Sequence, residues 1–167
     1  IDHFFPKFHS SGESACTAMS EAETGSDFFS LKTTAIKKGT GWEINGQKVW
    51  IVNGRHANLA IVYVQTKSIG DKTGIAGFAV DLNRIGVKRF PIHSLYSQNT
   101  MGTGGFELTN YVAKEADLIL PPGSAYKAIL NEINLARVYV ASMCCHMLEN
   151  LLRITKNYGS KRSAFGS

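Results

Sequence analysis

The sequence predicts an α+β fold, in which an antiparallel β-barrel or β-sandwich is followed by one long α-helix. Between residues 31 and 113, short runs rich in Val, Ile, Tyr and Phe alternate with turn residues, as β-strands do. From Ser124 to about Gly159, apolar residues recur every three or four positions, which is the period of an amphipathic helix. The 167 residues are 44% hydrophobic and 19% charged, a composition that suits a packed core.

Seven β-strands are predicted, at 31–36, 42–44, 48–52, 59–65, 75–82, 87–91 and 105–113, with an interruption at Thr109-Asn110. Asn45-Gly46 is the strongest short-range hairpin signal, because both residues tolerate the positive φ of a tight turn. We therefore expect a turn there between two short strands. Seven short strands fit a compact antiparallel barrel or sandwich.

The helix is predicted to begin after Ser124, a suitable N-cap that follows Pro121-Pro122-Gly123, and to end near Gly159. A helix of this length is about 50 Å long at 1.5 Å per residue and cannot bury its apolar stripe alone. We expect further helices, from a following helical bundle or from a partner subunit, to cover that stripe.

Charge and cysteine content limit the classes of function. The formal net charge of +5 comes from scattered Lys and Arg residues, so we predict no nucleic-acid partner and favour a small molecule that carries a diphosphate. Three cysteines, an odd count, indicate a reducing intracellular compartment rather than a disulfide framework. The five histidines lack metal-ligand spacing, so no metal site is predicted. No segment reaches the roughly 20 apolar residues that a transmembrane helix needs.

Two segments carry the functional signal. The first is a loop of small residues, Met19-Ser20-Glu21-Ala22-Glu23-Thr24-Gly25-Ser26-Asp27, in which backbone amides can approach a flat polar ligand. The second contains Trp50-Ile51-Val52, which would place an aromatic face beside that loop. Each segment alone is common. Their combination, in this order and at this separation, predicts a cofactor site.

Together these segments resemble the acyl-CoA dehydrogenase family, from about Phe5 to Phe165. The matching points are Gly12-Glu13, Ser20-Glu21, Gly25-Ser26-Asp27, Asn45-Gly46, Lys48, Trp50-Ile51, Arg137, Arg162 and Phe165-Gly166. The resemblance implies the end of an N-terminal helical region or linker over 1–15 and a middle β-domain over 16–118. Residues 119–167 would be the truncated start of a C-terminal helical domain. The chain would then be a fragment of a longer protein.

The resemblance also implies an FAD site and an acyl-CoA channel. The residues expected to contact FAD are Thr17, Ala18, Met19, Ser20, Gly25, Ser26, Trp50, Ile51, Val52, Arg162 and Phe165. Arg162 and Phe165 would reach the cofactor of a neighbouring subunit in a homodimer or homotetramer, and Ser20 is suited to donate a hydrogen bond to the pyrimidine edge. The residues expected to line the acyl-CoA channel are Ser26, Asn134 and Arg137. The catalytic base is expected beyond Ser167, because Ala136 stands where some members carry it on this helix.

The implied reaction is the α,β-dehydrogenation of an acyl-CoA thioester, with electron-transferring flavoprotein as the acceptor. The location would be the cytoplasm of a bacterium or the mitochondrial matrix of a eukaryote, and the fragment alone is expected to be inactive. Val52 stands where a Thr or Ser hydroxyl commonly approaches flavin N5 in this family. Its loss leaves open a flavin-dependent monooxygenase or oxidase of the same fold. A non-catalytic assembly relative is a further alternative.

Overall fold

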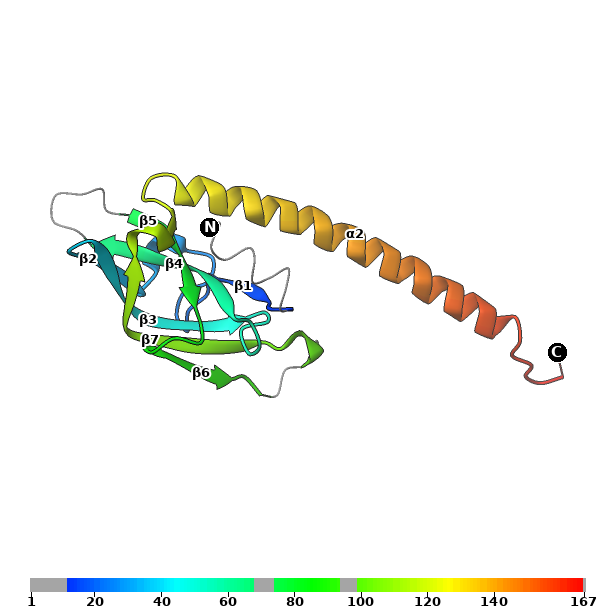
Figure 1. Ribbon diagram of the computed structural model, residues 1–167. Coiled ribbons are helices and arrows are strands. Elements are labelled where there is room, and N and C mark those ends of the chain that lie inside the picture. The colour runs from blue at the N-terminus through cyan, green and yellow to red at the C-terminus, as the bar shows by residue number, and fades with distance from the viewer. Residues whose placement is uncertain (1–11, 68–73, 94–98, 167) are drawn as a thin grey trace. The chain divides into compact units, whose positions relative to one another are not determined.

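The computed structural model describes residues 12–67, 74–93 and 99–166, and the chain divides into two compact units after Tyr126. The described part of the first unit contains an eight-stranded sheet (Figure 1). Its strands are β1 (Ala15–Ala18), β2 (Thr34–Lys38), β3 (Gly41–Ile51), β4 (Leu59–Lys67), β5 (Gly74–Asp81), β6 (Val87–Pro91), β7 (Gly104–Lys114) and β8 (Leu118–Leu120). Short 3-10 helices are η1 (Phe28–Ser30), η2 (Asn99–Met101) and η3 (Glu115–Asp117).

The sheet is mixed and open. Its strand order is β6-β7-β3-β2-β4-β5-β8, and β1 pairs with β4 outside this path. The pairings of β1 with β4 and of β2 with β4 are parallel, while the other described pairings are antiparallel. The predicted α+β class is confirmed. Because the sheet does not close, the sandwich alternative fits and the barrel does not.

The predicted hairpin at Asn45-Gly46 is wrong. Residues 41–51 form one continuous strand, β3, and the Asn-Gly pair lies at a β-bulge where the register with β7 shifts between Ile44 and Gly46. The side-chain oxygen of Asn45 accepts a hydrogen bond from the backbone N–H of Asn110 at 2.7 Å. The extra residue of this bulge lies on β7, where Asn110 has a φ of +49°, and Gly46 opposite it has a φ of +146°. The residue preference of Asn-Gly therefore indicated the wrong kind of irregularity.

The tight turn lies earlier, between β2 and β3, where Lys38 pairs with Gly41 and Gly39 has a φ of +58°. The predicted interruption at Thr109-Asn110 is not a break, because β7 is continuous and absorbs a φ of +49° at Asn110. Strands β1 and β8 were not predicted, since each is too short to show an alternating pattern.

The core of the first unit lies between the two halves of the folded sheet. Trp42 and Phe78 meet edge to face at its centre, with ring centroids 5.5 Å apart. The buried cluster also includes Ala18, Ile44, Ile51, Val62, Val64, Val80, Phe106, Leu108 and Tyr111. Side chains along the length of β3 contribute to this core. Their close packing fixes the position of the strand.

The second unit consists mainly of helix α2 (Ala125–Gly159), whose 35 residues match the predicted helix to within one residue at its start. Its apolar side chains Leu135, Val138 and Leu148 are largely exposed. The described residues leave this apolar stripe exposed, and its cover by further helices stays a prediction. None of the described helices is sufficiently long and apolar to span a membrane. Cys16 is buried, Cys144 and Cys145 are exposed, and all three are free thiols.

Candidate functional site

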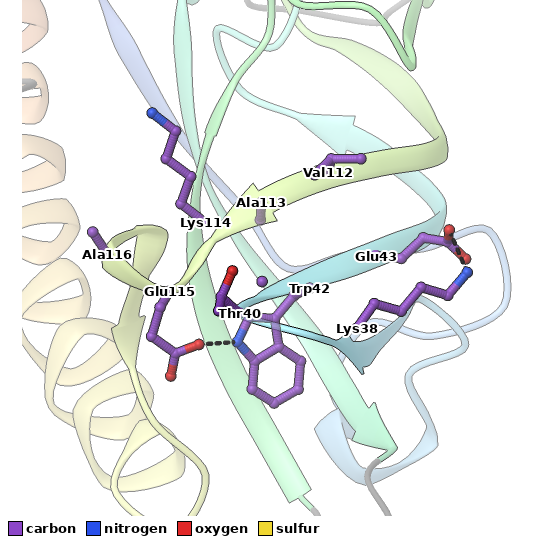
Figure 2. A pocket seen from close by; sticks show the side chains of 10 residues that line it. Lys38, Thr40, Trp42, Glu43, Val112, Ala113, Lys114, Glu115 and Ala116 are labelled. Atoms are coloured by element: carbon purple, nitrogen blue, oxygen red, sulfur yellow. Dashed lines mark hydrogen bonds and ion pairs between the residues drawn. The ribbon is translucent and has the colours of Figure 1, made fainter.

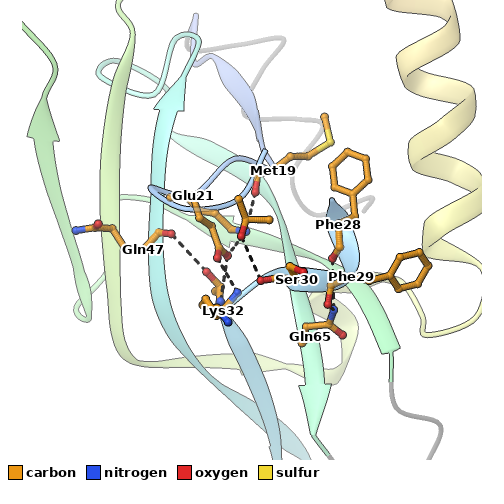
Figure 3. Close-up of polar contacts among 11 residues, drawn as sticks. Met19, Glu21, Phe28, Phe29, Ser30, Lys32, Gln47 and Gln65 are labelled. Atoms are coloured by element: carbon orange, nitrogen blue, oxygen red, sulfur yellow. Dashed lines mark hydrogen bonds and ion pairs between the residues drawn. The ribbon is translucent and has the colours of Figure 1, made fainter. Parts of the chain in front are cut away.

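A buried ion pair anchors the small-residue loop to β3. The Nζ of Lys48 lies 2.9 Å from Oε1 of Glu21, and both side chains are almost completely buried. The carboxylate of Glu21 also accepts hydrogen bonds from the backbone N–H groups of Lys32 at 2.6 Å and Thr33 at 3.0 Å (Figure 3). Both ends of the loop that runs from residue 19 to residue 33 are thereby tied to one charged pair.

The environment shifts the pKa values of both partners. Burial lowers the pKa of Lys48 to about 8, although the hydrogen bond and charge of Glu21 oppose this effect. Burial alone would raise the pKa of Glu21, but hydrogen bonds from Thr33, Lys48 and Lys32 outweigh it and lower that pKa below the ordinary value of 4.5. Glu21 is therefore ionised at neutral pH, and the ion pair is formed.

The lowered pKa of Glu21 gives a pH-dependent stability. A carboxyl group whose pKa is lower in the folded state contributes stability above the unfolded pKa, and this contribution disappears as pH falls through the folded pKa. We expect Glu21→Gln to lower the melting temperature at pH 7. The difference from the wild type should narrow below about pH 4, because a protonated carboxyl and an amide carry the same charge. Thermal unfolding of both proteins from about pH 3 to pH 7 tests this. A difference that stays constant over this range would contradict it.

The same lysine holds the backbone next to Ser20. Lys48 Nζ donates a hydrogen bond to the carbonyl oxygen of Met19 at 3.0 Å, and the N–H of Val49 donates to the carbonyl oxygen of Ser20 at 3.0 Å. Ser20 itself is half-buried. Among the described residues, none accepts a hydrogen bond from its hydroxyl or its backbone N–H. The hydroxyl and the backbone N–H of Ser20 are thus both available as donors. The carbonyl groups of Met19 and Ser20 are meanwhile held by residues of β3.

Trp50 presents its ring at the surface through an unusual backbone conformation. Its φ is +64°, its side chain is 57% exposed, and the register of β3 with β7 is irregular between Lys48 and Ile51. A positive φ is uncommon for a bulky residue and costs about 1–3 kcal/mol. Strain of this kind is concentrated at functional sites, so it supports a binding role for this stretch.

The end of β3 is also tied to β1. Asn53 has a φ of +61°, and its side-chain Nδ2 donates to Ser14 Oγ and to the carbonyl oxygen of Ala15, both at 3.1 Å. Val52, between Trp50 and Asn53, is 51% exposed. Lys48 and Val49 thus hold the start of the Met19–Asp27 segment on β3, and Asn53 ties the residue after Val52 to β1.

The predicted cofactor residues of the first unit differ in burial. Ala18 and Ile51 are buried in the core, whereas Thr17, Met19 and Ser20 are half-buried. Gly25 and Ser26 are exposed in the loop that Glu21 anchors. The segments that contain Met19-Ser20 and Trp50-Val52 are brought together by the hydrogen bonds described above. No hydrogen bond among the described residues links Gly25 or Ser26 to Trp50.

The remaining predicted residues belong to the second unit and are described within it alone. Arg137 donates to the side-chain oxygen of Asn134 at 3.1 Å, one turn away on α2. Arg162 follows the helix, and its backbone N–H donates to the carbonyl oxygen of Tyr158 at 3.0 Å. Phe165 is fully exposed, with a φ of +56°. All four side chains are accessible in this chain.

Sequence reasoning did not give Lys48 and Glu21 a role. Lys48 lies in a predicted strand, two residues before Trp50, and a lysine in a strand is ordinarily solvated. Its complete burial follows from the contacts with Glu21 and Met19, which a strand pattern does not reveal. The available signal was a charged residue directly before an apolar run, Val49-Trp50-Ile51-Val52.

A separate cavity of about 520 Å³ lies at the other end of β3 and β7, and no predicted site residue lines it. Figure 2 shows its main polar contacts. Trp42 Nε1 donates to Glu115 at 2.8 Å, and Lys38 pairs with Glu43 at 2.6 Å. Lys37 also pairs with Glu115 and lies over the Trp42 ring. Both acidic groups at this cavity are thus already neutralised.

The geometry of the first site suits a flat ligand with a polar edge. Trp50 offers an exposed aromatic surface, and Ser20 offers a hydroxyl and an N–H donor that the described residues leave unused. The small, exposed residues Gly25 and Ser26 allow close approach to the backbone. A flavin ring, which has an apolar face and an acceptor-rich pyrimidine edge, fits this donor set.

Comparison with known proteins identifies the relatives of this chain. The family model for the acyl-CoA dehydrogenase middle domain matches residues 16–111. The human mitochondrial short-chain specific acyl-CoA dehydrogenase is 29% identical over 165 residues, which cover 96% of this chain and 39% of that protein. The chain therefore spans about two fifths of the length of this relative.

Solved structures give the same result. A Geobacillus kaustophilus acyl-CoA dehydrogenase matches with a TM-score of 0.88 and 25% identity, over 99% of this chain and 44% of that one. A Mycobacterium smegmatis glutaryl-CoA dehydrogenase in complex with FADH2 matches with a TM-score of 0.65 and 29% identity, over 74% of this chain and 31% of that one.

Proposed function

The chain belongs to the acyl-CoA dehydrogenase family, and from this membership we propose that it forms the FAD-binding middle part of an enzyme that dehydrogenates an acyl-CoA thioester. The observation that carries the proposal is the junction of the Ser20 loop with Trp50-Ile51-Val52 through Lys48 and Val49. Relatives named as acyl-CoA dehydrogenases support the reaction class. A relative solved in complex with FADH2 supports the cofactor.

In this proposal, the residues of the first unit bind and orient the cofactor. Ser20 donates to the pyrimidine edge of the flavin, and Trp50 packs against the ring. Ser26 contacts both the cofactor and the acyl-CoA. FAD, when bound, would accept the hydride that leaves the β-carbon of the acyl group. Donors that are held in place before the reaction stabilise the developing negative charge without reorganisation.

The second unit contributes the substrate channel and the contact between subunits. Asn134 and Arg137, paired on one face of α2, line the acyl-CoA channel. Arg162 and Phe165 reach the FAD of a neighbouring copy, which makes a homo-oligomer part of the cofactor site. The base that removes the α-proton comes from a segment outside this chain, and an electron-transferring flavoprotein reoxidises the enzyme.

Purification of the complete protein tests the function. We expect it to carry flavin absorbance, which decreases when an acyl-CoA is added without oxygen, with formation of an enoyl-CoA. Absence of flavin absorbance after reconstitution with excess FAD would contradict the cofactor. Bound flavin that oxidises the acyl-CoA only with oxygen consumption would favour the oxidase alternative over the dehydrogenase.

Two arginines should separate cofactor binding from substrate binding. We expect Arg162→Ala to weaken FAD retention by about one to two powers of ten, because a guanidinium that contacts a pyrophosphate contributes roughly 1.5–3 kcal/mol. Arg137→Ala should instead raise the apparent substrate constant while FAD stays bound. Equilibrium FAD titration and stopped-flow reduction measure the two effects. Equal FAD loss in both variants would contradict these assignments.

A further inference from the structure

We infer that Lys48 is a positioning residue for the cofactor site, because its ammonium group holds the Met19 carbonyl and so directs the donors of Ser20 outward. The inference rests on the proposed function of this site. Lys48 does not itself offer a free group to a ligand, because its side chain is completely buried and bonded to Glu21 and Met19. Its effect is exerted through the peptide that joins Met19 to Ser20.

The geometry of that peptide sets the direction of the Ser20 N–H. No described residue is joined by a cis peptide bond. In a trans peptide the C=O and the following N–H are coplanar and point in opposite directions. Because the Met19 carbonyl points at Lys48 Nζ, at 3.0 Å, the Ser20 N–H points away from the buried pair. It meets no acceptor among the residues that the structure describes.

The next peptide is held from the same strand. The Ser20 carbonyl accepts the N–H of Val49, and the N–H of Glu21 donates to the carbonyl of Thr24 at 2.8 Å. The peptides on both sides of Ser20 therefore have fixed orientations, which restricts the backbone dihedrals of Ser20. Its hydroxyl is then limited to a few staggered directions. Loss of Lys48 would free the first of these peptides while the second stayed bonded.

Glu21 has a different part in this arrangement. Its carboxylate compensates the buried charge of Lys48 and accepts the N–H groups of Lys32 and Thr33, but it makes no contact with the Met19 carbonyl. The inference thus distinguishes the two partners. Lys48 should control the donors of Ser20, whereas Glu21 should control stability without changing their direction.

The test uses the complete protein and the double variant Lys48→Met/Glu21→Gln, which removes the contact with Met19 without leaving a buried unpaired charge. We expect its FAD dissociation constant to rise about tenfold, the effect of about one lost hydrogen bond. We also expect a more negative flavin midpoint potential, because the lost donors stabilise the reduced form. In a Ser20→Ala background, the same double variant should have a smaller effect, since residues that act through one group are not additive.

Two controls complete the experiment. Lys38→Met/Glu43→Gln neutralises an ion pair of the same residue types at the protein surface, and its FAD affinity and potential should match the wild type. Glu21→Gln alone retains the Lys48 contact with Met19 and should lose less FAD affinity than the double variant, whatever its stability. A folded Lys48→Met/Glu21→Gln protein with unchanged affinity and potential would overturn the inference. So would an equal loss of FAD affinity in folded Glu21→Gln, which keeps the Lys48 contact with Met19. An effect of the same size in the Ser20→Ala background would assign the contribution to the Ser20 N–H and not to its hydroxyl. Failure of the wild type to bind FAD would instead contradict the proposed function.

Discussion

Replacing Lys48 by Met alone is expected to lower the free energy of unfolding by about 3–5 kcal/mol, because it leaves the carboxylate of Glu21 buried without a counter-charge. The two side chains are 2.9 Å apart, and neither has appreciable contact with solvent. Glu21 would retain the hydrogen bonds from the N–H groups of Lys32 and Thr33, but no positive charge. Thermal or chemical unfolding of the wild type and the variant measures the loss.

The exposed pair of Lys38 and Glu43 provides the control for this prediction. Its nitrogen and oxygen are 2.6 Å apart, closer than those of Lys48 and Glu21, but the side chain of Lys38 is 60% exposed. Surface ion pairs contribute about 0–1 kcal/mol, so Lys38→Met should have little effect. Lys48→Met/Glu21→Gln should recover much of the lost stability. Equal losses in Lys38→Met and Lys48→Met would show that burial does not determine the contribution of the pair.

Replacing Gly46 by Ala is expected to destabilise the protein by about 2–6 kcal/mol, the sum of backbone strain and overpacking. Gly46 has a φ of +146°, which L-residues rarely adopt. A Cβ there would lie 2.6 Å from Cα of Thr33 and 2.7 Å from its Cβ. Thr33 is fully buried and donates its N–H to Glu21, so the displacement would reach the anchored loop. Unfolding by urea measures the change.

Gly74 separates the two contributions to that loss. Its φ is +148°, almost the same as that of Gly46, but no atom of the described residues lies within 4 Å of a Cβ built on it. Gly74→Ala should therefore cost only the conformational term, about 1–3 kcal/mol. The difference between the two variants measures the overlap with Thr33. A Gly46→Ala variant no less stable than Gly74→Ala would contradict the close packing of β3 on Thr33.

The sequence predicted the long helix and most strands because their signals are local. The 35-residue helix has a continuous apolar period, and β6 was predicted with its observed bounds, 87–91. The Asn45-Gly46 error has a different origin. A positive φ serves a turn or a bulge equally well, and only the pairing of β3 with β7 over its whole length decides between them.

The candidate site shows the same limit. Ser20 and Trp50 could be selected from the sequence because they lie within two short recognisable segments. Lys48 and Glu21 are 27 residues apart, and their meeting depends on the loop folding back onto β3. The sequence also did not reveal that Lys48 and Trp50 lie on opposite faces of β3, because residues two positions apart in a regular strand share a face.

The bulge between Lys48 and Ile51 interrupts the regular alternation of inward and outward side chains along β3. In a regular strand, side chains two residues apart share a face, yet Lys48 points into the interior and Trp50 points outward. Because of this one extra residue, β3 holds the loop through the buried Lys48 and exposes the ring of Trp50 to solvent only two positions later. Deleting that extra residue would restore ordinary alternation, and the pairing with β7 on both sides of the bulge would keep Lys48 and Ile51 on the buried face. A strand without the bulge could direct Lys48 inward and Trp50 outward only if these two residues were an odd number of positions apart.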